Sequence, residues 1–520
     1  MTVMVFRPRK ELNKVNKKGK PKDTKIGILI PIPYRAASSS LFMHLAYEYI
    51  NNLDDAIAYR YVYNIDEDVL ESLDQDIDPR YLDALLVSLS FELDYINIAK
   101  VLGALNLLPR YRKNTKPLII AGGIAPTANP LPLTEIVDAV VIGEAENVLD
   151  RIVDAVKDDR PLKRLEDINC IAISPFNSKV KRCIVESLDA AYHPVRQVCS
   201  PEEEPIYGYG IRIEISRGCP YLCPFCMEGH LLYPFRYRSE NVVKNIIESG
   251  FRFNTLARRV IFYSLSLFSI PYIDKLLEQL YENKISVSAP SLRPDHVNEE
   301  RLKMLYNLGQ KTITIAPETL VKRFGCNIGK CSDIDRISEI IINAYKVGYE
   351  HVKMYLITGF PQLDINEEMN YLRILMDKLR IIKRYHFLEI SINILIPKPW
   401  TPYQYVPPIH VMNNADKIKR YRELLKNYSF VRLDAMDSKW GFVQAILAQG
   451  DRNISSIIIE CAFKLCSPST LIKLIKSRGN YTYIYTGWRE EPPWTEVVDI
   501  GFNLKYFEYR FNYLSSKSQN

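Results

Sequence analysis

Residues 214–229 have the sequence Glu-Ile-Ser-Arg-Gly-Cys-Pro-Tyr-Leu-Cys-Pro-Phe-Cys-Met-Glu-Gly, which places three cysteines at the spacing C-x3-C-x2-C. The preceding run, residues 211–215, alternates apolar and charged side chains as a strand does, and a glycine and a proline then favour a loop. Cys219, Cys223 and Cys226 therefore follow the carboxyl end of a strand, where parallel α/β folds place their chemistry.

Three thiolates make an incomplete metal shell. Four-iron clusters are normally held by four cysteines, so three ligands on one loop leave one iron open to a non-protein ligand. Two other interpretations stay open here: a structural zinc site completed by His230, and buried cysteines that bind nothing. An open iron would mark a catalytic site.

The cysteine loop resembles the signature of the radical SAM superfamily, C-x3-C-x-aromatic-C, with Phe225 as the aromatic residue. The resemblance implies a 4Fe–4S cluster whose open iron binds the amino and carboxylate groups of S-adenosylmethionine. It also implies that an electron from the reduced cluster splits this cofactor and releases a 5′-deoxyadenosyl radical. A reductant such as ferredoxin or flavodoxin would supply the electron.

Length and composition predict a multidomain globular protein. The chain has 520 residues, of which 47% are hydrophobic and 25% charged, so two or three domains are expected. It has no run of about 18 apolar residues and no signal-peptide pattern, so we expect a cytoplasmic protein. The net charge of +7 comes partly from a lysine-rich segment, residues 1–24, which is expected to be a flexible tail. Attraction of this tail to RNA, or peripheral contact with anionic lipid, is the alternative.

Residues 25–165 alternate between strand-like and helix-like segments, which favours a doubly wound parallel sheet. The expected strands are residues 26–30, 58–63, 84–88, 117–123 and 139–143, with helices at residues 38–52 and 94–107.

This segment resembles the cobalamin-binding domain that precedes the radical domain in one class of radical SAM proteins. The matching positions are the turns at Gly122-Gly123 and Gly143-Glu144, which lie at strand ends. The histidine motif D-x-H-x-x-G that ligates cobalt in some cobalamin proteins is absent, and the nearest histidine is His44. Two interpretations remain: cobalamin binds without a histidine ligand, or the domain is an empty scaffold.

Residues 166–205 are mixed and polar and are expected to form a linker. Residues 206–408 again alternate, and with the strand before the cysteines they predict a partial (β/α)6 TIM-like barrel, the fold that the radical SAM resemblance also implies. The remaining strands are expected at residues 259–263, 285–289, 312–316, 351–357 and 389–396, with a helix at residues 333–347.

Several residues after the barrel strands are candidates for binding S-adenosylmethionine by resemblance. Glu318 is the candidate for its ribose or amino group, and Ser291 and Arg293 for its carboxylate. Each also has a structural alternative, such as a pair between Glu318 and Lys353. Together the candidates for this cofactor are Phe225, Ser291, Arg293, Glu318 and Lys353.

Residues 409–520 are expected to form a mostly helical domain that closes the substrate channel. Its basic and aromatic residues near 505–510 could instead stack nucleobases. The other seven cysteines are scattered and do not resemble a disulfide framework, although Cys326 and Cys331 could hold an auxiliary cluster. The aromatic candidates for a substrate wall are Trp400, Tyr403, Tyr405, Trp440, Trp488 and Trp494.

The resulting expectation is a radical enzyme that abstracts hydrogen from an unactivated carbon. In domain order and size the chain resembles archaeal tetraether-lipid (GDGT) ring synthases, which form cyclopentane rings on long apolar chains. The alternatives are a radical methyltransferase or methylthiotransferase acting on tRNA or protein, and a non-enzymatic metal- or cobalamin-binding module.

Overall fold

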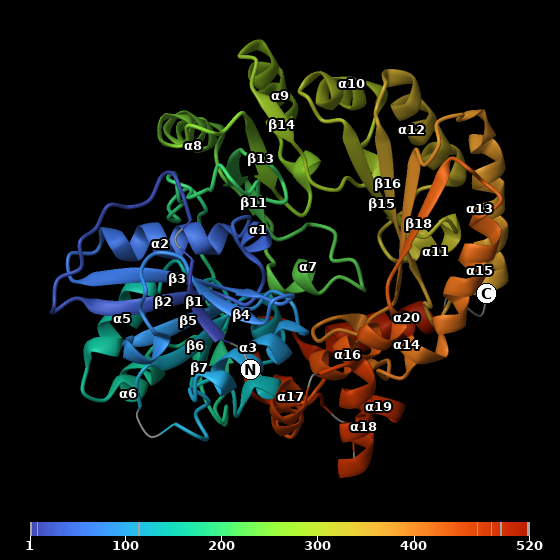
Figure 1. Cartoon of the computed structure of the whole chain (residues 1–520). Coiled ribbons are helices and arrows are strands. Elements are labelled where there is room, and N and C mark those ends of the chain that lie inside the picture. Colours follow the sequence, from blue (N-terminus) through green and yellow to red (C-terminus); the bar gives the residue numbers. More distant parts are fainter. Residues whose placement is uncertain are drawn as a thin grey trace.

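The computed structural model describes residues 3–7, 9–112, 115–464, 466–479, 481–488 and 491–516. An N-terminal sheet lies beside a parallel barrel, and C-terminal helices lie against both (Figure 1). The predicted fold class is therefore confirmed.

The N-terminal sheet has eight strands in the order β1-β4-β3-β2-β5-β6-β7-β8. Its central strands are parallel, whereas β4 and β8 run antiparallel to their neighbours β3 and β7. The strands are β1 (Val3–Phe6), β2 (Thr24–Ile30), β3 (Ala56–Asn64), β4 (Val69–Ser72), β5 (Ala84–Ser88), β6 (Leu118–Gly122), β7 (Ala139–Val141) and β8 (Ile171–Ile173).

Helices cover both faces of this sheet, because its strands carry apolar side chains on each side. One face packs against α2 (Leu41–Asn52), α5 (Leu149–Lys157) and α6 (Pro161–Glu166). The other face packs against α3 (Asp94–Ala104) and α4 (Ile124–Ala128), and this core continues into the barrel. The N-terminal part is thus doubly wound, as predicted.

The basic tail is the first correction, because its described part packs against the sheet. Strand β1 pairs in parallel with β4, and beyond it Glu11 is fully buried against the guanidinium of Arg60 at 2.7 Å. The prediction failed because it treated the charges of this segment as solvated, whereas Arg7 and Arg9 both pair with the buried Glu71. The segment expected as a linker also contributes β8 to the sheet.

The barrel has seven parallel strands in two sheets, β10-β13-β14 and β15-β16-β17-β18. A single bridge, between Leu292 and Ile315, joins the two sheets. Strand β18 adds a seventh strand to the six that the sequence predicted. The strands are β10 (Ile211–Glu214), β13 (Arg259–Tyr263), β14 (Ser286–Ser288), β15 (Thr312–Glu318), β16 (His351–Thr358), β17 (Leu388–Ile394) and β18 (Val431–Ala435).

Helices with one apolar face surround these strands, and local capping fixes their ends. For example, Asp333 accepts a hydrogen bond from the backbone of Arg336 to start α12, which ends at Gly348 with a φ of 109°. The helices are α8 (Glu240–Phe253), α9 (Ile273–Glu282), α10 (Glu299–Asn307), α11 (Lys322–Asn327), α12 (Ile334–Val347), α13 (Ile365–Lys378) and α15 (Ala415–Leu425).

The C-terminal region is mostly helical and bridges the other two parts. Helix α17 packs against α3 of the N-terminal part, and β19 (Val498–Asp499) pairs with β9 (Val180–Lys181) from the expected linker. Among the residues described, no helix is long and apolar enough to cross a membrane. The helices are α14 (His410–Asn413), α16 (Ser438–Ala448), α17 (Ile454–Phe463), α18 (Pro468–Arg478), α19 (Tyr483–Thr486) and α20 (Leu504–Ser516).

The cysteines outside the central loop are a second correction. Six of them form the disulfides Cys170–Cys183, Cys326–Cys331 and Cys461–Cys466, whereas scattered thiols were expected. Cys326 and Cys331 pair with each other, so in this structure they are not ligands of a second cluster. The unpaired cysteines are Cys199, Cys219, Cys223 and Cys226.

Candidate cluster and cofactor site

The three predicted cluster ligands lie on the loop between the short strand β11 (Ser216–Arg217) and the short helix α7 (Met227–Leu231). The thiol of Cys226 caps α7 by accepting a hydrogen bond from the backbone of Gly229 at 3.3 Å. Burial raises the pKa of all three thiols, and the charges of Lys330 and Arg293 oppose this shift at Cys219 and Cys223. Thiols in a largely buried loop, two of them beside positive charge, suit a site in which metal replaces the protons.

Two glycines leave room beside these sulfurs. A Cβ on Gly229 would lie 3.5 Å from the sulfur of Cys226, and one on Gly329 would lie 3.5 Å from that of Cys223. Gly329 has a φ of 76°, which favours glycine there. The donor set and the space around it therefore fit an iron–sulfur cluster.

His230 does not complete a zinc site with these cysteines. Its Nδ1 contacts the backbone oxygen of Cys226 at 2.8 Å, and aromatic side chains surround the ring. The ring of His230 thus packs among aromatic side chains, which favours a structural role over that of a zinc ligand.

Arg293, Lys330 and Glu318 form a charged group beside Cys223. Arg293 donates to the backbone oxygen of Gly329 at 2.7 Å and stacks over the ring of Tyr221. The Lys330 ammonium donates to the backbone oxygen of Ala316 at 2.8 Å and lies 3.5 Å from the Glu318 carboxylate. These contacts bring together Arg293 and Glu318, two of the residues that the sequence predicted to bind S-adenosylmethionine.

Glu318 has an uncommon backbone conformation, with a φ of 64° at the end of β15. Such a conformation costs on the order of 1–3 kcal/mol in a residue other than glycine, and it occurs often at functional sites. Burial raises the pKa of Glu318, although the neighbouring Lys330 opposes the shift. The carboxylate is thus held at a defined position by its surroundings.

Three connected cavities lie in this part of the molecule, and Glu318 lines one of them. A cavity of about 550 Å³ is lined by Phe225, Glu318, Tyr355, Asn393, Met436 and Trp440. A second, of about 1000 Å³, fills the barrel interior and shares Tyr355 with the first. A third, of about 490 Å³, lies at the edge of the N-terminal sheet and shares Glu214, Arg217 and Glu228 with the barrel interior.

The remaining candidates for S-adenosylmethionine are less closely grouped. Ser291 lines the barrel interior rather than the cavity that contains Phe225 and Glu318. Lys353 pairs with Glu389 at 2.8 Å, so the expected alternative pair between Lys353 and Glu318 is wrong. Lys330 occupies that place instead.

The glycine turns line the third cavity, but Glu144 has another role. Gly122, Gly123 and Gly143 lie along its wall, and Gly123 has a φ of 111°. Glu144 pairs with Arg217 at 2.9 Å and with Arg236 at 2.6 Å. Burial opposes ionisation of this carboxyl, yet the hydrogen bond from Arg236 and the charge of Arg217 hold its pKa below the usual value. Glu144 therefore links the sheet to the barrel.

His44 lies away from this cavity wall. It is buried, its Nε2 contacts the backbone oxygen of Ser38, and its Nδ1 accepts from the backbone of Val198. Burial lowers its pKa to about 3. Both ring nitrogens of His44 are thus engaged, and the histidine that lines the cavity is His193, whose Nε2 accepts from the backbone of Glu214 at 3.3 Å.

The comparisons with known proteins agree with this geometry. Residues 43–172 match the family of N-terminal domains of radical SAM proteins, and residues 213–375 match the radical SAM superfamily. The chain belongs to the radical SAM superfamily. This membership implies a 4Fe–4S cluster and S-adenosylmethionine as cofactors and a reductant as electron source.

Three relatives are informative. An uncharacterized protein of Methanocaldococcus jannaschii is 29% identical over 477 residues, which cover 91% of this chain and 98% of the relative. A bacteriochlorophyllide d C-8(2)-methyltransferase of Chlorobaculum tepidum is 20% identical over 404 residues, 69% of this chain and 80% of the relative. The methyltransferase TsrM of Kitasatospora setae, solved with cobalamin and a 4Fe–4S cluster bound, has a TM-score of 0.52 at 13% identity, covering 75% of this chain and 78% of that chain.

Proposed function

We propose that this radical SAM enzyme is a cobalamin-dependent methyltransferase. The observation that carries the proposal is the cavity at Gly122 and Gly123, which opens toward the barrel interior past Arg217. A cofactor held at the sheet edge would face a substrate in the barrel. The similarity to TsrM, whose structure holds cobalamin, supports this assignment of the cavity.

In this proposal each cavity has one occupant. S-adenosylmethionine would lie beside Phe225 and Glu318, cobalamin at the glycine turns, and the substrate in the barrel interior. When bound, S-adenosylmethionine would supply the methyl group, cobalamin would carry it, and the cluster would supply an electron. Glu318 would accept hydrogen bonds from the S-adenosylmethionine, and the C-terminal helix α16 would exclude water through Trp440 and Gln444.

The barrel interior also bears on the substrate. Its wall carries many hydroxyl groups, whereas a mid-chain lipid substrate would need an apolar channel. The expected ring closure on tetraether lipids therefore has less support than methyl transfer. The hydroxyl-bearing residues are Ser39, Ser90, Ser216, Ser264, Ser288, Ser291, Thr312, Thr314, Tyr207, Tyr263 and Tyr355.

Gly122 offers a matched pair of variants for the test. The nearest neighbour atom, on Val141, would lie 3.8 Å from an added Cβ, so Gly122→Ala fits, whereas Gly122→Phe would place a ring at the cavity wall where cobalamin is proposed to bind. We expect anaerobically purified wild type and Gly122→Ala to bind cobalamin and to release S-adenosylhomocysteine. Gly122→Phe should lose cobalamin and that product but keep its iron.

The same assays of cobalamin binding and product release can also contradict the proposal. A wild-type protein that binds no cobalamin and releases 5′-deoxyadenosine without S-adenosylhomocysteine would refute methyl transfer. Deleting the gene and extracting membrane lipids and modified nucleosides would then test ring closure, since missing cyclopentane rings with unchanged nucleosides would favour the lipid function.

A further inference from the structure

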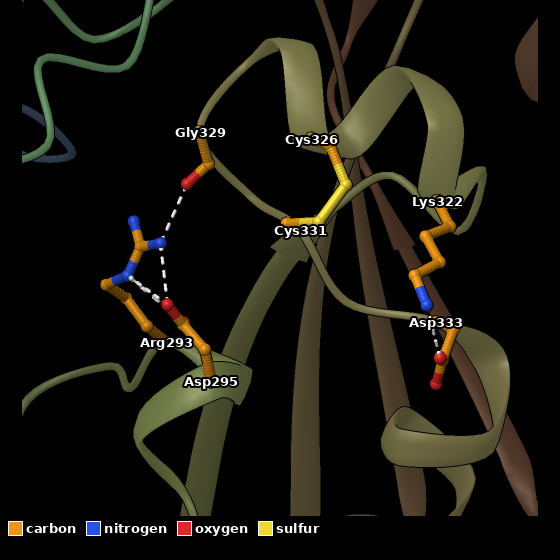
Figure 2. Close-up of a disulfide and its surroundings, with 7 residues drawn as sticks. All are labelled: Arg293, Asp295, Lys322, Cys326, Gly329, Cys331 and Asp333. Carbon is orange, nitrogen blue, oxygen red and sulfur yellow. Dashed lines mark hydrogen bonds and ion pairs between the residues drawn. A yellow bond between two sulfur atoms is a disulfide. The ribbon is translucent and has the colours of Figure 1, made fainter.

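The disulfide Cys326–Cys331 differs from the other two in its exposure. Both of its cysteines are exposed, whereas the other disulfides each contain one buried cysteine, Cys170 or Cys461. It closes a loop with a sequence separation of 5, at the end of α11 (Figure 2). An exposed disulfide is open to attack by an external thiolate.

The inner side of the same loop forms part of the cluster site. The Gly329 carbonyl points toward Arg293 and accepts its hydrogen bond (Figure 2), and Gly329 lies beside the sulfur of Cys223. The next residue, Lys330, is buried and reaches Glu318 and the backbone of Ala316. One short loop therefore has a solvent-exposed disulfide on one side and cluster contacts on the other.

We propose that Cys326 and Cys331 form a reversible thiol–disulfide site that locks loop 326–331 against the cluster. This inference depends on the cluster at Cys219, Cys223 and Cys226 and not on methyl transfer. The disulfide state holds the wall formed by Gly329 and Lys330 in place. The dithiol state lets this wall open and exposes the cluster to solvent.

The chemistry requires a dithiol reductant of the thioredoxin class. Its thiolate attacks one sulfur of the pair, the Cys326–Cys331 bond breaks, and a mixed disulfide forms. The second thiol of the reductant then displaces the protein sulfur. The reductant leaves as a disulfide, oxidised by two electrons, and the two cysteines gain these electrons and two protons as thiols.

Reduction has a limited structural effect, because other contacts remain. The Lys330 backbone donates to the Gly325 carbonyl at 2.7 Å, and Lys322 pairs with Asp333 at 2.9 Å across the base of the loop (Figure 2). The loop should therefore keep its fold and open more often. From the chain entropy that a crosslink of this size removes, we expect opening to increase on the order of tenfold.

The test compares cluster-loaded protein equilibrated anaerobically with oxidised or reduced dithiothreitol. An iron chelator is added, and loss of the visible absorbance of the cluster is followed. We expect loss to be about tenfold faster for the reduced protein and for the variant Cys326→Ser/Cys331→Ser. The variant Cys461→Ser/Cys466→Ser is the matched control, because it removes a disulfide of the same separation away from the cluster and should behave as wild type.

A second readout does not require the cluster. Differential alkylation and mass spectrometry over a series of glutathione potentials should show that Cys326 and Cys331 become reduced before the other two pairs. Free thiols at both positions under oxidising conditions would overturn the proposal. Equal rates of cluster loss in the oxidised and reduced wild-type protein would overturn it as well, even if the serine variant fails to fold.

Discussion

Asp94, in the first turn of α3, is a single residue whose surroundings predict a pH dependence of stability. Burial raises its pKa to about 7, a hydrogen bond from Asn97 opposes the shift, and the nearby Glu92 adds to it. In the unfolded chain the pKa would be about 3.9. The folded protein thus binds this proton more tightly, so the stability that Asp94 contributes is complete below about pH 4 and is lost as pH rises through about 7.

The variant Asp94→Asn should remove this loss. At about pH 8 we expect its free energy of unfolding to exceed that of the wild type by about 1–3 kcal/mol, and at about pH 4 we expect no gain. Urea unfolding at both pH values measures the difference. Asp154→Asn, at an exposed position on α5, is the control, and an equal gain in that variant would contradict the explanation.

Among single residues, the sequence allowed prediction of those candidates whose side-chain chemistry forms a recognisable motif. The three cysteines and Glu318 belong to a recognisable pattern, and the structure places Glu318 in a charged group beside Cys223. Lys330 was missed because its burial depends on a turn that brings the end of α11 back over β15. Its position beside a cysteine pair was the one available signal.

Asn129 joins two helices that belong to different parts of the chain. Its side-chain amide nitrogen donates to the backbone oxygen of Ala448, the last residue of α16, at 3.0 Å and to that of Gly450 at 2.8 Å. Its side-chain oxygen accepts from the backbone of Leu131 at 3.1 Å. Asn129 therefore fixes α4, which follows the glycine turn, against the C-terminal region.

Replacing Asn129 should weaken this junction. Asn129→Ala leaves two buried carbonyl groups without their donor, so we expect a loss of about 1–3 kcal/mol in the free energy of unfolding. Asn129→Asp should be worse, because a carboxylate would face the two carbonyl oxygens. Thermal unfolding measures both, with Asn427→Ala at an exposed position as control, and an aspartate variant as stable as wild type would show that this junction is unimportant.

The elements themselves were predictable where the pattern of apolar residues was strong. Strands β5 and β13 have the predicted bounds, because each is an apolar run between turn residues. Strand β18 was missed although its residues alternate between apolar and charged as a strand does, because it lies within the segment that was expected to be mostly helical. Strand β1 was missed because the lysines after it dominated the composition of the segment.

Arg217 connects the two halves of the molecule. It follows β10 of the barrel and pairs with three carboxylates, those of Glu144 and Glu146 from the N-terminal part and that of Glu214 in the barrel. Burial alone would lower the pKa of its guanidinium, but the three carboxylates, Glu214 foremost, together raise it above the usual value. Replacing a buried cation that has several partners is costly, because the partner carboxylates are left buried without a counter-charge.

We expect Arg217→Met to destabilise the protein by about 3–5 kcal/mol. The N-terminal part should then unfold separately from the barrel, giving two transitions in calorimetry. Arg110→Met, which breaks the exposed pair with Glu135, is the control and should cost about 0–1 kcal/mol. A variant at Arg217 that unfolds in one transition at the wild-type temperature would exclude this coupling.

The aromatic residues around His230 have a consequence for the order in which the molecule is assembled. Phe502 and Phe507 pack against His230, directly after the cysteine loop, and β19 anchors the same segment to β9. During synthesis the ribosome releases the cysteine loop long before these residues. A nascent chain that has not reached residue 498 therefore has the cysteine loop and His230 but lacks these aromatic contacts, so the surroundings of His230 are completed only when the C-terminal segment has been made.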